Sequence, residues 1–491
     1  MHRRPLLGVG LAVVGLLFGC DAAPSSPASS TAETSPGDAE LRLESGHGSR
    51  VAAVNRSGIG LVINISGGPV MDRSNPFFQA IGTNGRSCST CHEAETGMTL
   101  TPERARLRFL LTGGTDPVFR TNDGSVSPLA DVSTVQARAQ AYRLLLQRGL
   151  IRVGIGMQNV TEFDLVEVDD PYHYASASEL SLFRRPLPSM NLRFLSTVMF
   201  DGRETFKDPT QPNGFATIHF DLSDQSNAAT LGHAQSARPL TDAERESIVD
   251  FESQLLGAQI YDENAGRLDV AGASGGPEPL ATQEYYFGIN DVLGGDPEGH
   301  PFDPVVMTAY SGWQRFADRA EGRHRHGRDP ARAAVARGET LFNTKPIAIR
   351  DVGGLNDDLG LEVIPGTCTS CHDTPNAGNH SVPAPLRIGT ADPHPVGGLD
   401  VSGLPVYTFR NRTTGATVQT TDPGRALITG KWKDISRFKG PTLRGLASRA
   451  PYFHNGSADS LQTVVEFYDA RFSIGLTDDE KADLVAFLQT L

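Results

Sequence analysis

Two short motifs carry the residues of this 491-residue chain that are best suited to chemistry. Each has two cysteines three positions apart with a histidine directly after the second, and they read Cys88-Ser-Thr-Cys91-His92 and Cys368-Thr-Ser-Cys371-His372. Two such thiols can each add to a vinyl group of one haem while the chain curls into a helical turn, which places the next histidine under the iron. The motifs therefore predict two covalently bound haem c groups, with His92 and His372 as iron ligands.

The other uses of paired cysteines fit this chain less well. A zinc site or a thioredoxin-like cysteine pair does not require a histidine at the next position, and here that histidine occurs twice. The chain has five cysteines, and the fifth, Cys20, lies near the N-terminus, so none of the four motif cysteines is expected in a disulfide.

The N-terminus predicts export, which c-type haem attachment requires. Arg3 and Arg4 precede an apolar run that ends in Phe18-Gly-Cys20, so we interpret residues 1–20 as a lipoprotein-type signal peptide. The alternative is an ordinary signal peptide with an incidental cysteine. Residues 21–48 are rich in Ser, Ala, Pro and Thr and are expected to form a disordered tether. We therefore expect a periplasmic protein, anchored to a bacterial membrane only by lipid on Cys20.

The charge balance narrows the range of partners. A formal net charge of −13 argues against a nucleic-acid partner, because little in the chain would neutralise a phosphate backbone. An acidic surface suits a basic electron carrier instead, so we expect a small redox protein, either a cytochrome or a cupredoxin, as the electron donor.

Helices are expected to hold the two motifs. Capping residues and apolar periodicity predict helices from Pro102, over 133–148, 241–256, 330–342 and 460–468, and from Thr477 to the end. No convincing set of alternating strands is visible. We therefore predict a mainly α fold of two cytochrome c-like haem domains with long loops and little β-structure. The expected division is an N-terminal haem domain at 49–260, a loop-rich connecting segment at 261–329 and a C-terminal haem domain at 330–491.

Further motifs resemble a known family. After the second haem motif come Phe438-Lys-Gly-Pro-Thr-Leu-Arg444 and Ala450-Pro-Tyr-Phe-His-Asn-Gly456, and Phe200-Asp-Gly-Arg203 lies between the haem motifs. Together with the spacing of the haem motifs, they are similar to the bacterial dihaem cytochrome c peroxidase and MauG family over residues 75–491. The resemblance implies that hydrogen peroxide or O₂ reacts at the N-terminal haem while electrons pass through the C-terminal haem.

The resemblance also implies a second ligand for the C-terminal haem. Peroxidases of the family use a methionine there and MauG-like enzymes use a tyrosine, and alignment from the Pro-Tyr-Phe-His block puts Tyr468 at this position. The last methionine of the chain is Met307, so the C-terminal domain cannot supply a thioether. The alternative is that Tyr468 is a core tyrosine. His454 is expected near this haem, either as a buried structural histidine or as a group that tunes the haem.

Three positions depart from the family pattern. Gln225 matches a family glutamine, but the residue ten positions later, where the family has a catalytic glutamate, is Gln235. The acid-base role would then fall to His233. The alternative is that His233 is a structural histidine on an exposed turn. Phe200 replaces the family's inter-haem tryptophan. Arg185 stands loosely where the family's bridging calcium has an asparagine ligand, which argues against bound Ca²⁺ and favours pairing with a haem propionate.

These departures leave two functions open. The first is an enzyme that activates peroxide or O₂, and the second is a non-catalytic dihaem electron-transfer cytochrome. Loss of the glutamate and of the tryptophan favours the carrier, whereas a tyrosine ligand favours the enzyme. Other candidates for the sixth ligand of the N-terminal haem are His173, Met98, Met190 and Met199, for which surface exposure or core packing is the alternative.

Overall fold

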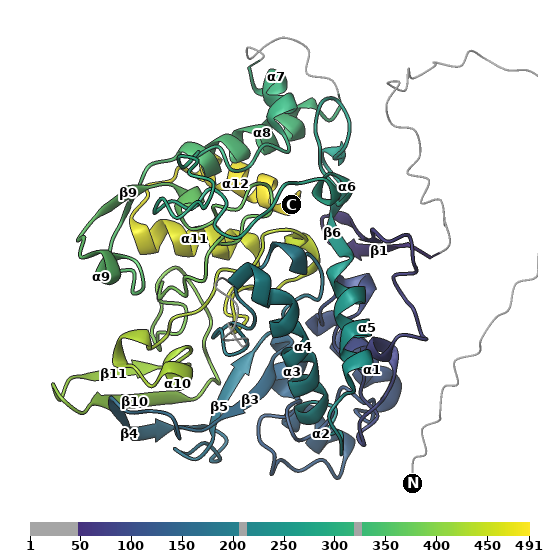
Figure 1. The fold of residues 1–491 in the computed structure, drawn as a ribbon, viewed down its shortest axis with the longest axis vertical. Helices are drawn as coiled ribbons and strands as arrows, with labels where there is room; N and C mark the ends of the chain where they lie inside the picture. The colour runs from purple at the N-terminus through teal and green to yellow at the C-terminus, as the bar shows by residue number, and fades with distance from the viewer. Residues whose placement is uncertain (1–47, 206–213, 319–326) are drawn as a thin grey trace, which may run out of the picture. The chain divides into compact units, whose positions relative to one another are not determined.

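The computed structural model describes residues 48–205, 214–318 and 327–491 (Figure 1). The expected signal peptide, Cys20 and all of the tether except residue 48 lie outside these residues. The described part of the chain from residue 48 onward belongs to one compact unit. No helix among these residues is long and apolar enough to cross a membrane.

The described residues form helices and small antiparallel sheets. The largest sheet has the strand order β1-β2-β6-β7, from β1 (Arg50–Asn55), β2 (Gly58–Asn64), β6 (Leu255–Asp262) and β7 (Gly266–Arg267). A second has the order β11-β10-β4, from β4 (Phe163–Asp169), β10 (Val406–Asn411) and β11 (Thr417–Thr420). Two-stranded pairs are β3 (Ile151–Ile155) with β5 (Leu180–Arg184) and β8 (Ile347–Ile349) with β9 (Ile364–Gly366).

The prediction of a mainly α fold with little β-structure is therefore wrong in its second half, and the fold is mixed. The strands escaped the sequence analysis because several are buried on both faces and so show no polar alternation. Every residue of β5 is buried, and β6 is buried apart from Tyr261. Strand β6 also runs across residue 260, where the N-terminal haem domain was expected to end.

Most expected helices are present. The longer ones are α1 (Pro102–Thr112), α4 (Gly214–Gly232), α5 (Asp242–Ser253), α8 (Asp329–Thr344), α11 (Leu461–Phe472) and α12 (Asp478–Gln489). The helix expected over 133–148 is instead two, α2 (Val135–Ala141) and α3 (Arg143–Arg148). They divide at Tyr142, which leaves the helical backbone conformation and packs its buried ring 5.1 Å from Phe119. Short helices complete the set: α6 (Glu278–Ala281), α7 (Gln314–Ala317), α9 (Asn356–Leu359) and α10 (Ala426–Thr429).

The C-terminal haem motif lies next to a tight helix crossing. Helices α8 and α12 pack together beside α11 (Figure 1). Gly338 of α8 allows this approach, because a Cβ atom there would lie 2.0 Å from the carbonyl oxygen of Asp483 on α12. Phe342 and Phe487 then meet at 5.6 Å in the core of this region.

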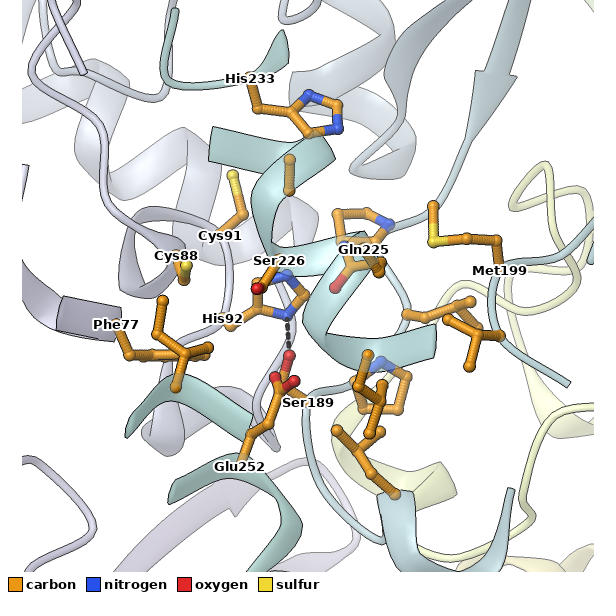
Figure 2. Close-up of a pocket in the computed structure, with 18 of the residues that line it drawn as sticks. Phe77, Cys88, Cys91, His92, Ser189, Met199, Gln225, Ser226, His233 and Glu252 are labelled. Atoms are coloured by element: carbon orange, nitrogen blue, oxygen red, sulfur yellow. Dashed lines mark hydrogen bonds between the residues drawn. The ribbon is translucent and has the colours of Figure 1, made fainter. Parts of the chain in front are cut away.

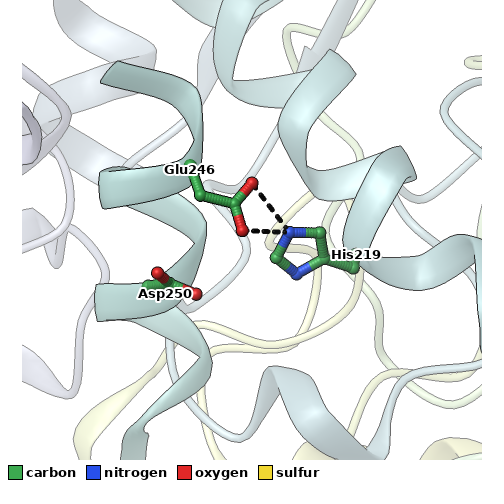
Figure 3. A group of neighbouring side chains, drawn as sticks. All are labelled: His219, Glu246 and Asp250. Atoms are coloured by element: carbon green, nitrogen blue, oxygen red, sulfur yellow. Dashed lines mark hydrogen bonds and ion pairs between the residues drawn. The ribbon is translucent and has the colours of Figure 1, made fainter. Parts of the chain in front are cut away.

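Near the N-terminal motif, α5 packs on the 3₁₀ turn Pro76–Phe78, and Phe77 and Phe251 meet at 5.2 Å. Helix α4 runs beside α5, and the two are joined on the surface by His219, whose ring lies 3.0 Å from the Glu246 carboxylate (Figure 3). Asp250 lies one turn further along α5, and all three side chains are exposed. Because exposed ion pairs contribute little, the packing of the two helices holds this region.

A buried ion network joins segments that are far apart in sequence. At the end of β5, Arg184 donates to Asp422 at 2.7 and 2.9 Å and also pairs with Asp201. Burial alone would raise the pKa of Asp201, but Arg184 and Arg203 outweigh it and lower that pKa to about 2. Asp201 is therefore charged, and the members of the Asp201–Arg184–Asp422 network depend on one another.

We predict that Arg184→Ala lowers the free energy of unfolding by about 3–5 kcal/mol, because two buried carboxylates lose their partner. Arg412→Ala removes an exposed pair with Asp164 and is the matched control, with an expected loss below about 1 kcal/mol. Denaturant unfolding of the purified proteins measures both. Equal losses in the two variants would show that the buried network does not stabilise the fold.

Candidate haem sites

The N-terminal motif forms a tight turn that presents His92. The 3₁₀ turn Cys88–Thr90 is closed by a capping box between Ser87 and Thr90. Nδ1 of His92 lies 3.1 Å from the Met98 carbonyl oxygen and 3.2 Å from the Ser189 hydroxyl. Burial lowers the pKa of His92 to about 4, so the ring is neutral, as a metal ligand must be. With Nδ1 engaged, Nε2 is left for iron.

The C-terminal motif repeats this geometry. The 3₁₀ turn Cys368–Ser370 is closed by a capping box between Thr367 and Ser370. Nδ1 of His372 lies 2.6 Å from the Gly378 carbonyl oxygen, again six residues after the histidine. Burial lowers the pKa of His372 as well. The two motifs are thus two copies of one local structure.

Each motif lines a large apolar cavity. The first, of about 1570 Å³ and open to solvent, has Cys88, Cys91 and His92 in its wall (Figure 2). The second, of about 1880 Å³, has the corresponding residues of the C-terminal motif in its wall. Two thiols, one histidine with a free Nε2 and an apolar surround fit a covalently attached haem in each cavity.

Helix α4 supplies a polar group of side chains to the first cavity. Gln225, Ser226 and His233 line it, the last from just beyond the C-terminal end of the helix (Figure 2). Gln235 is not brought to the cavity wall. Its backbone is in the left-handed region, and its side-chain oxygen accepts from the Asn84 amide at 3.3 Å.

His233 is held by a buried carboxylate. Its Nδ1 lies 2.5 Å from Asp123, which also pairs with the buried Arg86. Burial would raise the pKa of Asp123, but His233 and Arg86 outweigh it and lower that pKa. The ring of His233 is partly exposed at the edge of the cavity. A histidine oriented by a carboxylate in this way can take up and release protons.

Glu252 on α5 is a further acidic group in the first cavity, and the sequence analysis missed it. It is buried, and burial raises its pKa to about 8 against the opposing effect of a hydrogen bond from Ser189 (Figure 2). The residue could have been noticed by aligning α5 with α12, because each helix begins after a capping threonine. In this alignment, Glu252 of α5 corresponds to the apolar Leu488 of α12.

Tyr468 faces the second cavity from α11. Its ring stacks on Phe472 at 6.1 Å and contacts Phe467 at 5.4 Å. Burial raises the pKa of its hydroxyl, with smaller contributions in the same direction from Cys371 and Cys368 of the haem motif. The residue therefore lies close to the cysteines that would hold the second haem.

His454 also lines the second cavity, between two aromatic rings. It stacks on Phe438 with 3.9 Å between centroids and meets Phe200 edge-on at 6.2 Å. Burial lowers the pKa of His454 to about 4, although Asp422 opposes this, and the ring is therefore neutral. Nε2 has no hydrogen-bond partner in the part of the chain that the structure describes, although Asp422 lies 4.0 Å away.

The two cavities share a wall. Phe200, Lys439 and Pro441 line both, as do Arg185 and the three residues that follow it. The buried ammonium of Lys439 donates to the Thr197 carbonyl at 2.7 Å, and its backbone N–H donates to the Phe200 carbonyl at 2.9 Å. Burial lowers the pKa of Lys439 to about 7. One layer of side chains thus separates the two candidate haem sites.

Arg185 is anchored in this region by backbone oxygens. Its guanidinium donates to the carbonyls of Arg148, Gly149, Arg449 and Ala450 at 3.0 to 3.5 Å. Burial and the nearby Arg449 lower the pKa of Arg185 to about 10, so it still carries its charge at neutral pH. Carbonyl oxygens of this kind are ligands that Ca²⁺ accepts, and here they already have a cation.

The other candidate ligands differ in position. His173 is exposed and is not among the residues that line either cavity. Met98 is buried in the core beside Phe77, whereas Met190 and Met199 line the first cavity. Tyr452 lines the second cavity, and Trp432 packs against Phe163 at 6.1 Å.

Comparison with known proteins supports the haem interpretation. The chain is 31% identical over 149 residues to the cytochrome-c peroxidase IdrP2 of Denitromonas iodatirespirans, a match that covers 27% of this chain and 38% of that protein. It is 30% identical over 145 residues to the cytochrome c551 peroxidase of Nitrosomonas europaea, covering 29% and 36%. The chain is similar to bacterial cytochrome c peroxidases, as its motifs predict. These matches span well under half the length of either relative.

Two further comparisons add little. No protein-family model matches the chain. A solved structure described as a MauG-like protein associated with microbial copper homeostasis shares 16% identity, with a TM-score of 0.34 over 85% of this chain and 86% of that one.

We predict that Arg185 makes the protein indifferent to calcium. Arg185→Ala removes the donor of three buried carbonyls and of the partly buried Ala450 carbonyl, and should lower the free energy of unfolding by about 3 kcal/mol or more, since each unsatisfied buried group costs about 1–3 kcal/mol. Thermal melting of the holoprotein, with and without a calcium chelator, measures both effects. Arg193→Ala, which removes one exposed 3.4 Å contact, is the control. A wild-type protein that calcium stabilises would contradict this interpretation of Arg185.

Proposed function

We propose that this chain is a dihaem c-type oxidoreductase that reduces hydrogen peroxide, or activates O₂, at an N-terminal haem and receives electrons through a C-terminal haem. The observation that carries the proposal is the pair of cavities that each hold a Cys-x-x-Cys-His turn and share one wall. The similarity to named peroxidases supports the same activity.

Each haem, when bound, would supply an iron that passes single electrons and that reacts with peroxide where its sixth position is open. The protein's task at the first cavity is to hold His92 neutral, to orient the peroxide and to move protons. Reduction of one peroxide to two waters takes two electrons and two protons. Gln225 and Ser226 offer an amide and a hydroxyl to orient the substrate.

His233 is the residue best suited to move these protons. Asp123 fixes the ring orientation and stabilises the imidazolium when it forms, as the carboxylate does in other acid-base pairs. His233 thus takes the acid-base role that the missing glutamate would have had. An amide such as that of Gln225 cannot exchange a proton at a useful pKa.

The shared wall defines the electron path between the haems. Phe200 is hard to oxidise and has no N–H to donate, so electrons would tunnel through the wall without residing on this ring. At the second cavity, His372 and Tyr468 would hold the iron of the haem. A phenolate ligand favours ferric iron and lowers the reduction potential.

Export and partners follow from the same proposal. The signal sequence supports a periplasmic location, with lipid on Cys20 as the membrane anchor. A small basic cytochrome or cupredoxin would supply the electrons, which agrees with the net charge of −13.

One observation favours the alternative, a non-catalytic electron carrier. Met199 lines the first cavity, and a thioether bound to the iron would close the position that peroxide needs (Figure 2). Met199→Leu separates the two functions. If Met199 is a ligand, the variant loses a low-spin signal and gains peroxide reactivity.

The proton role of His233 is tested by peroxide turnover of the holoprotein with a reduced small cytochrome. His233→Ala is expected to lower the rate by about 10²–10⁴-fold, and Asp123→Asn by less, because general acid-base groups contribute factors of this size. His219→Ala, which changes an exposed histidine on the outer surface of α4, is the control and should leave the rate unchanged. A wild-type protein that does not consume peroxide would refute the enzymatic proposal, and undiminished turnover in His233→Ala would refute the role of His233.

The ligand role of Tyr468 is tested by spectroscopy. Tyr468→Phe should change the ferric low-spin signal of the C-terminal haem and raise its reduction potential, since the phenolate is lost. Tyr452→Phe is the matched control, because Tyr452 lines the same cavity but its hydroxyl donates to the Leu446 carbonyl at 3.0 Å. The assignment fails if Tyr468→Phe leaves the spectrum unchanged.

A further inference from the structure

The two haem motifs have the same arrangement of neighbouring aromatic residues, which we call the frame. Each residue of one site can therefore be matched to a residue of the other site. In both, the histidine ring packs near a phenylalanine, Phe77 at 6.2 Å from His92 and Phe342 at 5.9 Å from His372. In both, that phenylalanine packs on a second one, which is Phe251 on α5 or Phe487 on α12. Each of these two lies ten residues after the threonine that caps its helix. The next residue is Glu252 in the first frame and Leu488 in the second.

This position is where the two sites differ most. Glu252 and Leu488 each line the cavity of their own site and are each less than a tenth exposed. A buried carboxyl group is costly and is retained only where it has a partner or a task. One oxygen of Glu252, Oε1, has no hydrogen-bond partner among the described residues, and the carboxyl group lies beside the Ser189 hydroxyl (Figure 2).

Ser189 connects Glu252 to the proximal histidine. Its backbone N–H donates to the Met98 carbonyl at 3.0 Å, the same oxygen that accepts from His92. Its hydroxyl lies 3.2 Å from Nδ1 of His92 (Figure 2). If Nε2 binds iron, Nδ1 carries the proton and donates to this hydroxyl, and the hydroxyl in turn donates to Glu252.

The C-terminal site has no such chain. Nδ1 of His372 is held by the Gly378 carbonyl at 2.6 Å, and no side-chain hydrogen bond to that ring is found among the described residues. Leu488 offers only apolar contact. A histidine whose outer N–H leads to a carboxylate is a stronger electron donor to its metal than one bonded to a neutral carbonyl, and the carboxyl group of Glu252 is ionised above its pKa of about 8.

We propose that Glu252 is a positioning residue that acts through Ser189 on His92 and lowers the reduction potential of the N-terminal haem. This rests on the proposed function only in that His92 binds haem iron. The consequence is that the site favours ferric iron, the state that resting peroxidases present to peroxide. The second site reaches a low potential by a different route, through its second ligand.

The test is a potentiometric titration of the holoprotein, with each haem followed by its own absorption and EPR signals. Glu252→Gln and Ser189→Ala should each raise the midpoint potential of the N-terminal haem. We expect about a tenfold change in its reduction equilibrium, which is 59 mV for a one-electron couple. The potential of the C-terminal haem should not move and serves as the internal reference.

Two features of the experiment distinguish this role from a structural one. The double variant should shift the potential no further than Ser189→Ala alone, because Glu252 acts through Ser189. The iron–histidine stretching frequency of the ferrous N-terminal haem should fall in each variant. Glu339→Gln is the matched control, since Glu339 is also a buried glutamate on a helix but lines neither cavity.

Each outcome decides the inference. An unmoved potential in folded Glu252→Gln, or fully additive shifts in the double variant, would overturn it. A shift of the same size in Glu339→Gln would do so as well. A protein with two haems and shifted potentials but no peroxide turnover would keep this inference and refute the proposed activity. A chain that binds no haem at His92 would refute both.

Discussion

Two adjacent arginines at the end of strand β5 hold together the region between the candidate haem sites. Successive side chains of a strand point to opposite faces, so Arg184 and Arg185 reach different partners. Arg184 joins the buried carboxylates of Asp201 and Asp422, and Arg185 joins four backbone carbonyls. Because buried charges tolerate no loss of a partner, this pair fixes the chain segments that form the shared wall.

That wall lies between the two candidate haem sites. Phe200 directly precedes Asp201, so the ion network positions the aromatic ring that lines both cavities. Lys439 closes the wall from the C-terminal part through its bonds to the Thr197 and Phe200 carbonyls. The wall is thus a closely bonded contact between the two parts of the chain.

Within this frame, the two sites share their backbone and differ in their side chains. The histidine, its carbonyl partner and the two phenylalanines repeat, which accords with duplication of one haem unit. The first site adds polar groups, with Glu252 and Ser189 behind the histidine and His233 at the cavity edge. The second is lined mainly by apolar side chains and Tyr468. One frame can therefore serve two chemical roles.

The sequence predicts the parts of this arrangement that are local. The haem turns, the capped helices and the position of Tyr468 on an apolar helix face follow from short motifs. The pairing of His233 with Asp123 does not, because the two lie 110 residues apart and nothing near Asp123 marks it. Glu252 on an otherwise amphipathic helix is easily taken for a surface residue. The buried strands lack the alternation by which strands are recognised.

EPR of the fully oxidised holoprotein tests most directly whether the two haems are unequal. We expect one high-spin ferric signal, from an N-terminal haem that only His92 would bind, and one low-spin signal, from a C-terminal haem that His372 and Tyr468 would bind. Two low-spin signals that persist when one haem is reduced and peroxide is added would contradict it, and would identify the protein as an electron carrier.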